Sequence, residues 1–179
     1  ADRAFLLFST HSMPASYIKD GDPYEGQVKR SMDLVLKRLG WPSDRTSLSF
    51  QSKLGPVPWL APATEDVLGE LAQRGERDVI VCPISCTADC LETLEEIGMG
   101  YAEMFAEASG GGTLHLVPSL NDDDDFIEAL ASLVRRGPRR IDLSTSLPAL
   151  PQSSPHEGIQ QLVNRLVHVG ISVPGPLDS

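Results

Sequence analysis

The sequence has no long apolar run, no excess of basic residues and few cysteines. No stretch approaches the roughly 20 apolar residues that a membrane-spanning helix needs, and no signal peptide opens the chain, so we expect a soluble, cytoplasmic protein. A formal net charge of −10 argues against nucleic acid as a partner. Three cysteines, Cys82, Cys86 and Cys90, do not make a disulfide framework and favour a reducing compartment.

What the sequence contains is the composition of an ordinary globular protein. Its 179 residues are 41% hydrophobic and 22% charged, which suits one well-buried domain with a short addition. We expect an α/β domain over residues 1–137, and a Ser- and Pro-rich linker with an appended helix over 138–179. The chain begins at Ala1 directly before an apolar run, which indicates a missing upstream portion.

Apolar runs and helical repeats alternate along residues 1–137. Strands are predicted at 4–8, 48–51, 78–83 and 113–117, each followed by apolar residues at helical spacing over 28–39, 67–71, 91–101 and 126–134. This alternation predicts a doubly wound, four-stranded parallel sheet covered on both faces. Ligands bind such sheets beyond the carboxyl ends of the strands, so the chemistry is expected in the loops that begin at Ser9, Gln51, Ile84 and Pro118.

Several local features can also be predicted. Thr64 is expected to cap a helix, and His115 to be packed inside the last strand. Acidic residues at 122–125 suit a helix start better than a calcium loop, and the glycines at 110–112 suit a helix stop. The helix after the third strand is expected to bury Leu91, Leu94, Ile97 and Tyr101.

A histidine and two glutamates are the candidate chemical groups. His11 follows the first strand, although a loop histidine by itself is more often a surface or structural residue. Glu92 and Glu96 follow the third strand on one helical face, for which a solvated acidic surface is the competing interpretation. An imidazole that faces a carboxylate can bind a divalent metal and take up protons. The cysteines do not have the spacing or number of a closed metal site.

Five motifs, in this order, resemble the second half of the ferrochelatases up to the end of the fourth predicted helix. They are FSTHSMP at 8–14, GDPY at 21–24, FQSKLGPVPWLAPAT at 50–64, CTADCLETLEEI at 86–97 and PSLND at 118–122. Gly98 and Gly100 stand where many relatives carry acids, and Cys90 replaces a histidine of many members, as in some bacterial ones.

The resemblance implies a set of site residues. His11 matches the family histidine at which the porphyrin is metallated, and Glu92 matches the carboxylate across the pocket. Both, together with Glu96, are the expected metal-contacting residues. The residues expected to contact or support the substrate are Ser12, Met13, Pro14, Trp59 and Asp89.

The resemblance further implies a lyase of haem biosynthesis that inserts ferrous iron into a porphyrin, with protoporphyrin IX favoured over coproporphyrin III. Iron is then a substrate, and neither a tightly bound cofactor nor an iron-sulfur cluster is expected. The expected partners are porphyrin, ferrous iron, and a missing N-terminal half or a second copy of the chain, with peripheral membrane association left open. The alternatives are a single-domain homodimeric tetrapyrrole chelatase and a non-catalytic porphyrin-binding module.

Overall fold

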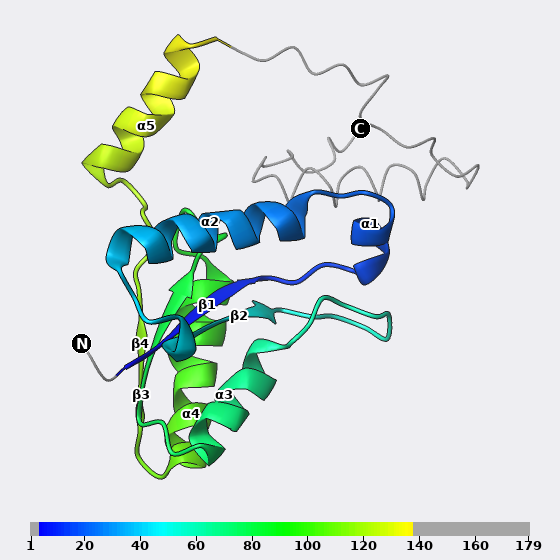
Figure 1. Cartoon of the computed structure of the whole chain (residues 1–179), viewed down its shortest axis with the longest axis vertical. Helices are drawn as coiled ribbons and strands as arrows, with labels where there is room; N and C mark the ends of the chain where they lie inside the picture. Colours follow the sequence, from blue (N-terminus) through cyan, green and yellow to red (C-terminus); the bar gives the residue numbers. More distant parts are fainter. Residues whose placement is uncertain (1–3, 138–179) are drawn as a thin grey trace, which may run out of the picture. The chain divides into compact units, whose positions relative to one another are not determined.

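Four parallel strands form the centre of the fold (Figure 1). The computed structural model describes residues 4–137, and the linker and helix expected over 138–179 lie outside the described residues. The strands are β1 (Phe5–His11), β2 (Thr46–Gln51), β3 (Asp78–Pro83) and β4 (Thr113–Leu116), in the order β2-β1-β3-β4. The predicted α/β class with a four-stranded parallel sheet is confirmed.

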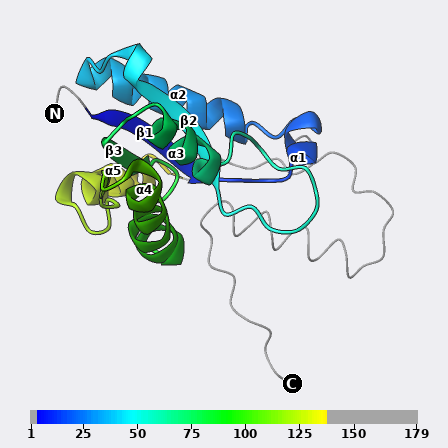
Figure 2. The ribbon, with the colours of Figure 1, turned by 90° about the horizontal axis from the view of Figure 1, so that it is seen from below.

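Helices follow the strands as the alternation predicts. α1 (Ala15–Lys19) and α2 (Tyr24–Leu39) follow β1, and the short 3-10 helix η1 (Ser43–Arg45) leads into β2. α3 (Thr64–Gln73) follows β2, the π-helix η2 (Glu92–Tyr101) and α4 (Ala102–Ser109) follow β3, and α5 (Asp124–Arg135) follows β4. α2 lies over one face of the sheet, and α3 and α4 lie over the other (Figure 2). None of the helices in this described part is both long and apolar enough to cross a membrane.

Burial on both faces explains the continuous apolar run of β1. Residues 5–8 are all buried, as expected for a strand that has a neighbour on each side and helices on both faces. The main apolar cluster lies between the sheet and the helices α3, η2 and α4. Its fully buried members include Leu7, Leu68, Leu71, Val79, Val81, Ile97 and Phe105.

The helix after β3 departs from the predicted α-helical pattern because it is a π-helix. Ile97 is buried, but Leu91 and Leu94 are exposed, and Tyr101 is only half-buried. A π-helix has more residues per turn than an α-helix, so a residue three positions before Ile97 no longer shares its face. The prediction that Leu91 and Leu94 belong to the core is therefore wrong.

Two polar residues also differ from the predictions. Thr64 does not cap α3, because its hydroxyl is hydrogen-bonded to the hydroxyls of Ser9 and Ser49, each at 3.0 Å. His115 is exposed, and its Nε2 lies 3.5 Å from Asp78. Since β4 is an edge strand and side chains alternate along it, His115 points away from the core.

α5 starts at the acidic residues, as predicted, but its apolar residues are not part of the core. Asp123 caps the helix by accepting hydrogen bonds from the backbone N–H groups of Asp125 and Phe126, at 3.0 and 3.2 Å. Its apolar residues stay outside the core cluster, because α5 leads away from the sheet (Figure 1). The exposed apolar residues of α5 are Ile127, Leu130, Leu133 and Val134.

Replacement of Leu68 by Ala is expected to lower the free energy of unfolding by roughly 2–5 kcal/mol, because it leaves a cavity in a close-packed cluster. Leu68 is 0% exposed, whereas Leu34 on α2 is 62% exposed. Leu34→Ala is therefore the matched control, with an expected change below about 0.5 kcal/mol. Urea denaturation followed by circular dichroism measures both, and equal losses would contradict this placement of the core.

Candidate functional site

The carboxyl ends of β1, β2 and β3 converge at one edge of the sheet. In the parallel ladders His11 is paired with Gln51 of β2, and Ser9 is paired with Pro83 of β3. The loops that follow these strands therefore start side by side. His11 is the last residue of β1, Trp59 lies in the loop after β2, and the loop after β3 leads to Glu92. The sequence analysis singled out all three, and they lie toward the edge where ligands bind in sheets of this kind.

Backbone and ring contacts fix the orientation of His11. Its Nδ1 lies 2.7 Å from the carbonyl oxygen of Ser12, and its backbone N–H donates to Ser85 Oγ at 3.1 Å. A carbonyl only accepts hydrogen bonds, so Nδ1 carries the proton in the neutral ring. The unprotonated nitrogen of the neutral ring is then Nε2, which suits it to act as a base or as a metal ligand.

Tyr24 stabilises the backbone at His11, and the sequence analysis did not assign it this role. Its hydroxyl donates to the carbonyl oxygen of His11 at 2.8 Å and lies 2.6 Å from Thr10 Oγ1. Burial raises the pKa of this hydroxyl, so it stays protonated and able to donate. The GDPY motif was the sequence feature that could have indicated a role for Tyr24. In this motif the carboxylate of Asp22 accepts a hydrogen bond from the backbone N–H of Tyr24 at 2.9 Å.

Glu92 at the first turn of η2 is kept ionised by its surroundings. The thiol of Cys90 makes the largest contribution to lowering the pKa of the Glu92 carboxyl, and the charge of His11 lowers it further. The attraction of His11 is the smallest of these contributions to the pKa of Glu92. His11 and Glu92 both follow strands that pair in the sheet, and their action in one site stays a prediction.

The three cysteines are free thiols in the structure. Burial raises the pKa of Cys86 to about 11, and burial also raises the pKa of Cys82, so both remain protonated at neutral pH.

Within residues 4–137 no group of three or more His, Cys, Asp or Glu side chains is arranged to hold a metal ion.

Asp89 ties the loop after β3 to the loop after β4. Its carboxylate accepts a hydrogen bond from Asn121 Nδ2 at 2.8 Å, and its backbone N–H donates to Asn121 Oδ1 at the same distance. Thr93 Oγ1 donates to the same carboxylate at 3.3 Å. The Asn121 side chain is the first of the contacts that lower the pKa of Asp89. Asp89 therefore holds the start of η2, on which Glu92 lies.

The expected substrate contacts fall into two groups. Ser12 and Met13 are buried, so they support the loop from inside. Pro14 and Trp59 are half-buried and form an isolated bridge between their two loops. A role in substrate contact stays a prediction for all four residues.

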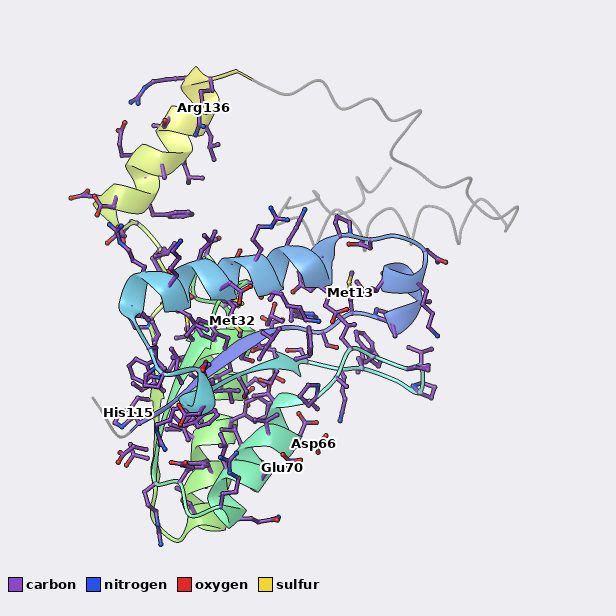
Figure 3. The ribbon with its side chains drawn as sticks, in the orientation of Figure 1. Met13, Met32, Asp66, Glu70, His115 and Arg136 are labelled. Carbon is purple, nitrogen blue, oxygen red and sulfur yellow. The ribbon has the colours of Figure 1, made fainter. Side chains whose placement is uncertain are left out.

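A groove of about 830 Å³ lies between the loop after β2 and α3. Trp59 lines it from the loop, and Asp66 and Glu70 line it from α3, on the outer side of that helix (Figure 3). Neither His11 nor Glu92 lines this groove. It is therefore a feature beside the candidate site and not the site itself.

Comparisons of the sequence with family models and with curated proteins point to one family. A family model described as ferrochelatase matches residues 1–137. A ferrochelatase of Picosynechococcus sp. is 44% identical over 134 residues, which are 74% of this chain and 34% of the relative. A ferrochelatase of Synechococcus sp. is 40% identical over 159 residues, which are 86% of this chain and 41% of the relative. A relative named coproporphyrin III ferrochelatase, from Limosilactobacillus reuteri, is 42% identical over 131 residues, 73% of this chain and 42% of the relative. The chain spans less than half the length of these curated relatives.

Replacement of Cys90 by Ala is expected to raise the pKa of Glu92 toward its ordinary value of 4.5, because the thiol is the main group that lowers it. A titration of the Glu92 carboxyl by carbon NMR measures the shift. Cys82→Ala is the matched control, since Cys82 lies within β3 and does not contribute to the pKa of Glu92.

The same change has a consequence for stability. Folding lowers the pKa of Glu92, so the ionised carboxylate stabilises the folded protein at neutral pH, and this contribution is lost as the pH falls through the pKa of the folded state. The Cys90→Ala protein should therefore lose less stability on acidification. If the Glu92 carboxyl titrated at the same pH in the Cys90→Ala protein and in the unmodified protein, the assigned role of the thiol would be wrong.

Proposed function

This chain belongs to the ferrochelatase family, and from that membership we propose that it forms one half of an enzyme that inserts ferrous iron into a porphyrin. The observation that supports the proposal is that His11 ends β1 and Glu92 follows the neighbouring strand β3, so that both lie toward the carboxyl edge of the sheet. The reaction takes up Fe²⁺ and releases two protons from the pyrrole nitrogens. A site for it needs a base and negative charge close to the ring centre.

His11 is the proposed proton acceptor. Its Nδ1–H is held by the Ser12 carbonyl, so a pyrrole proton would be taken up at Nε2 and the ring would become an imidazolium. Tyr24 and Ser85 fix the backbone of His11, which keeps the ring from turning away as it gains charge. Nε2 is also the atom that would contact the incoming iron before it enters the macrocycle.

Glu92 is the proposed counter-charge. A carboxylate that stays ionised can balance the imidazolium, attract the hydrated iron and accept the second proton. The Cys90 thiol favours this ionised form. The two groups come from neighbouring strand ends, so a flat macrocycle placed beyond the sheet edge could meet both.

A complementary half is the proposed partner. The chain spans 34–42% of the length of the relatives described above, so more than half of their length has no counterpart here. We propose that this remaining portion covers the apolar face of α5, which includes Leu130 and Leu133 and is contained in the part that the family model matches. An exposed apolar stripe of this kind marks an interaction surface.

The proposed porphyrin is protoporphyrin IX, and coproporphyrin III is the competitor. One relative named as a coproporphyrin III ferrochelatase is about as similar to this chain as those named simply ferrochelatase. Initial rates with both porphyrins, measured on the same enzyme, would decide between them. We further propose that the protein needs no tightly bound cofactor.

Introduction of Glu at both Leu130 and Leu133 is expected to abolish binding of the chain to the non-matching part of the Picosynechococcus ferrochelatase, because it buries charge in an apolar contact. Co-elution of the two separately produced parts measures binding. Ser132→Glu on the polar face of the same helix is the matched control and should keep it. If the unmodified chain instead forms a stable dimer that the double variant disrupts, a second copy covers α5 and the half-enzyme proposal is wrong.

His11→Ala and Glu92→Gln are each expected to lower iron insertion about 100-fold or more in the reconstituted two-part protein. Formation of the metalloporphyrin, followed by absorbance, measures the rate. His115→Ala is the control, since that exposed histidine lies on the edge strand away from the site. A rate unchanged by His11→Ala would show that the site is misassigned, and porphyrin binding without metallation in the unmodified protein would favour a binding module.

A further inference from the structure

The carboxylate of Glu96 is occupied by hydrogen-bond donors from two different elements. Its Oε1 accepts from the backbone N–H of Ser52 at 3.0 Å and from the hydroxyl of Tyr101 at 2.7 Å. Its Oε2 accepts from the hydroxyl of Ser52. Glu96 therefore connects η2 to the first residue after β2.

Ser52 needs such a contact because its backbone is unfavourable. Its φ of 62° lies in the left-handed region, which residues other than glycine avoid. Two hydrogen bonds to one carboxylate hold it there. The direction in which the chain leaves β2 thus depends on Glu96.

The π-helical geometry of η2 makes the contact with Tyr101. Tyr101 lies five residues after Glu96, a spacing that aligns in a π-helix and diverges in an α-helix. Burial first, and then the neighbouring Glu96, raise the pKa of the Tyr101 hydroxyl, so it stays a donor. The same hydroxyl lies 3.4 Å from Glu65, and Glu65 pairs with Lys53 at 2.8 Å. Because Lys53 is the residue after Ser52, this series of contacts returns to the loop from which it started.

The loop that Glu96 holds also supports the segment after His11. Within loop 52–63, the backbone N–H of Leu60 donates to the carbonyl of Met13 at 3.0 Å. The carbonyl of Pro58 accepts from the backbone N–H of Ala15 at 2.9 Å. Loop 52–63 is therefore in direct contact with the chain that leaves His11.

We propose that Glu96 is a positioning residue, which together with Ser52 and Tyr101 locks loop 52–63 to η2 and thereby sets the placement of His11 relative to Glu92. The sequence-based expectation that Glu96 contacts metal stays a prediction, and the experiments below separate it from this role. Its catalytic consequence rests on the proposed function. The structural coupling itself can be tested without any activity.

Glu96→Gln is the discriminating substitution. An amide keeps the shape of the carboxylate, so its oxygen can accept from Ser52 N–H and Tyr101, and its nitrogen can donate to Ser52 Oγ. In the reconstituted enzyme we expect Glu96→Gln to retain kcat within about threefold, and Glu96→Ala to lower kcat about tenfold or more with the KM for ferrous iron changed less than about twofold. If Gln is as damaging as Ala, or if the iron KM rises, Glu96 handles metal or protons and the proposal is wrong.

Hydrogen exchange of the 179-residue chain provides a test that needs no catalysis. Glu96→Ala and Tyr101→Phe should speed exchange of the Ser52 and Leu60 amides by about tenfold, because both amides depend on the locked loop. Glu95→Ala, an exposed change on the same helix, should leave them unaltered. Unchanged exchange in both test variants would overturn the proposal. If the unmodified reconstituted protein made no metalloporphyrin while exchange followed this pattern, the proposed function would fail and the coupling would stand.

Discussion

The parallel pairing of β1 with both β2 and β3 is the constraint on which the candidate site depends. It brings three strand ends to one edge and makes the loops that follow them neighbours. Side chains alternate along a strand, so a shift of one residue in the register would exchange the faces toward which buried Thr10 and half-buried His11 point. The fully buried residues of β1 prevent such a shift, because both faces of the strand are packed. The site therefore inherits its precision from the apolar core.

A buried polar layer separates that core from the site edge. The hydroxyls of Ser9, Ser49 and Thr64 are linked to one another, and Ser9 also donates to Gln51. Gln51 is fully buried, and its Nε2 has no partner among the described residues, which costs about 1–3 kcal/mol. Hydrogen bonds are directional, whereas apolar packing is not. The layer thus orients the ends of β1 and β2 in a way that apolar residues could not.

The sheet could be predicted because its strands are short, continuous apolar runs separated by helical repeats, and both patterns depend only on nearby residues. The predictions that were wrong depend on contacts between residues that are far apart in the sequence. Thr64 has the residue type of a helix cap, yet partners from two strands take its hydroxyl. His115 is in a strand, but its exposure depends on β4 being at the edge of the sheet. The placement of His11 and Glu92 after neighbouring strands was predictable from the strand order, while the contacts of Tyr24 and Ser52 depend on side-chain positions that the sequence pattern does not give.

Because η2 is a π-helix, the α-helical spacing of apolar residues over 91–101 did not predict which of its residues are buried. An α-helical reading places Glu92 and Glu96 together and leaves Tyr101 on another face. The wider turn instead aligns Glu96 with Tyr101, and it is compatible with Gly98, where a Cβ atom would lie 3.2 Å from the carbonyl of Thr93, five residues earlier. Such helices are rare and are frequently found at functional sites. Here the altered spacing lets one carboxylate accept hydrogen bonds from both Tyr101 and Ser52, which connects η2, where Glu92 lies, to the loop after β2.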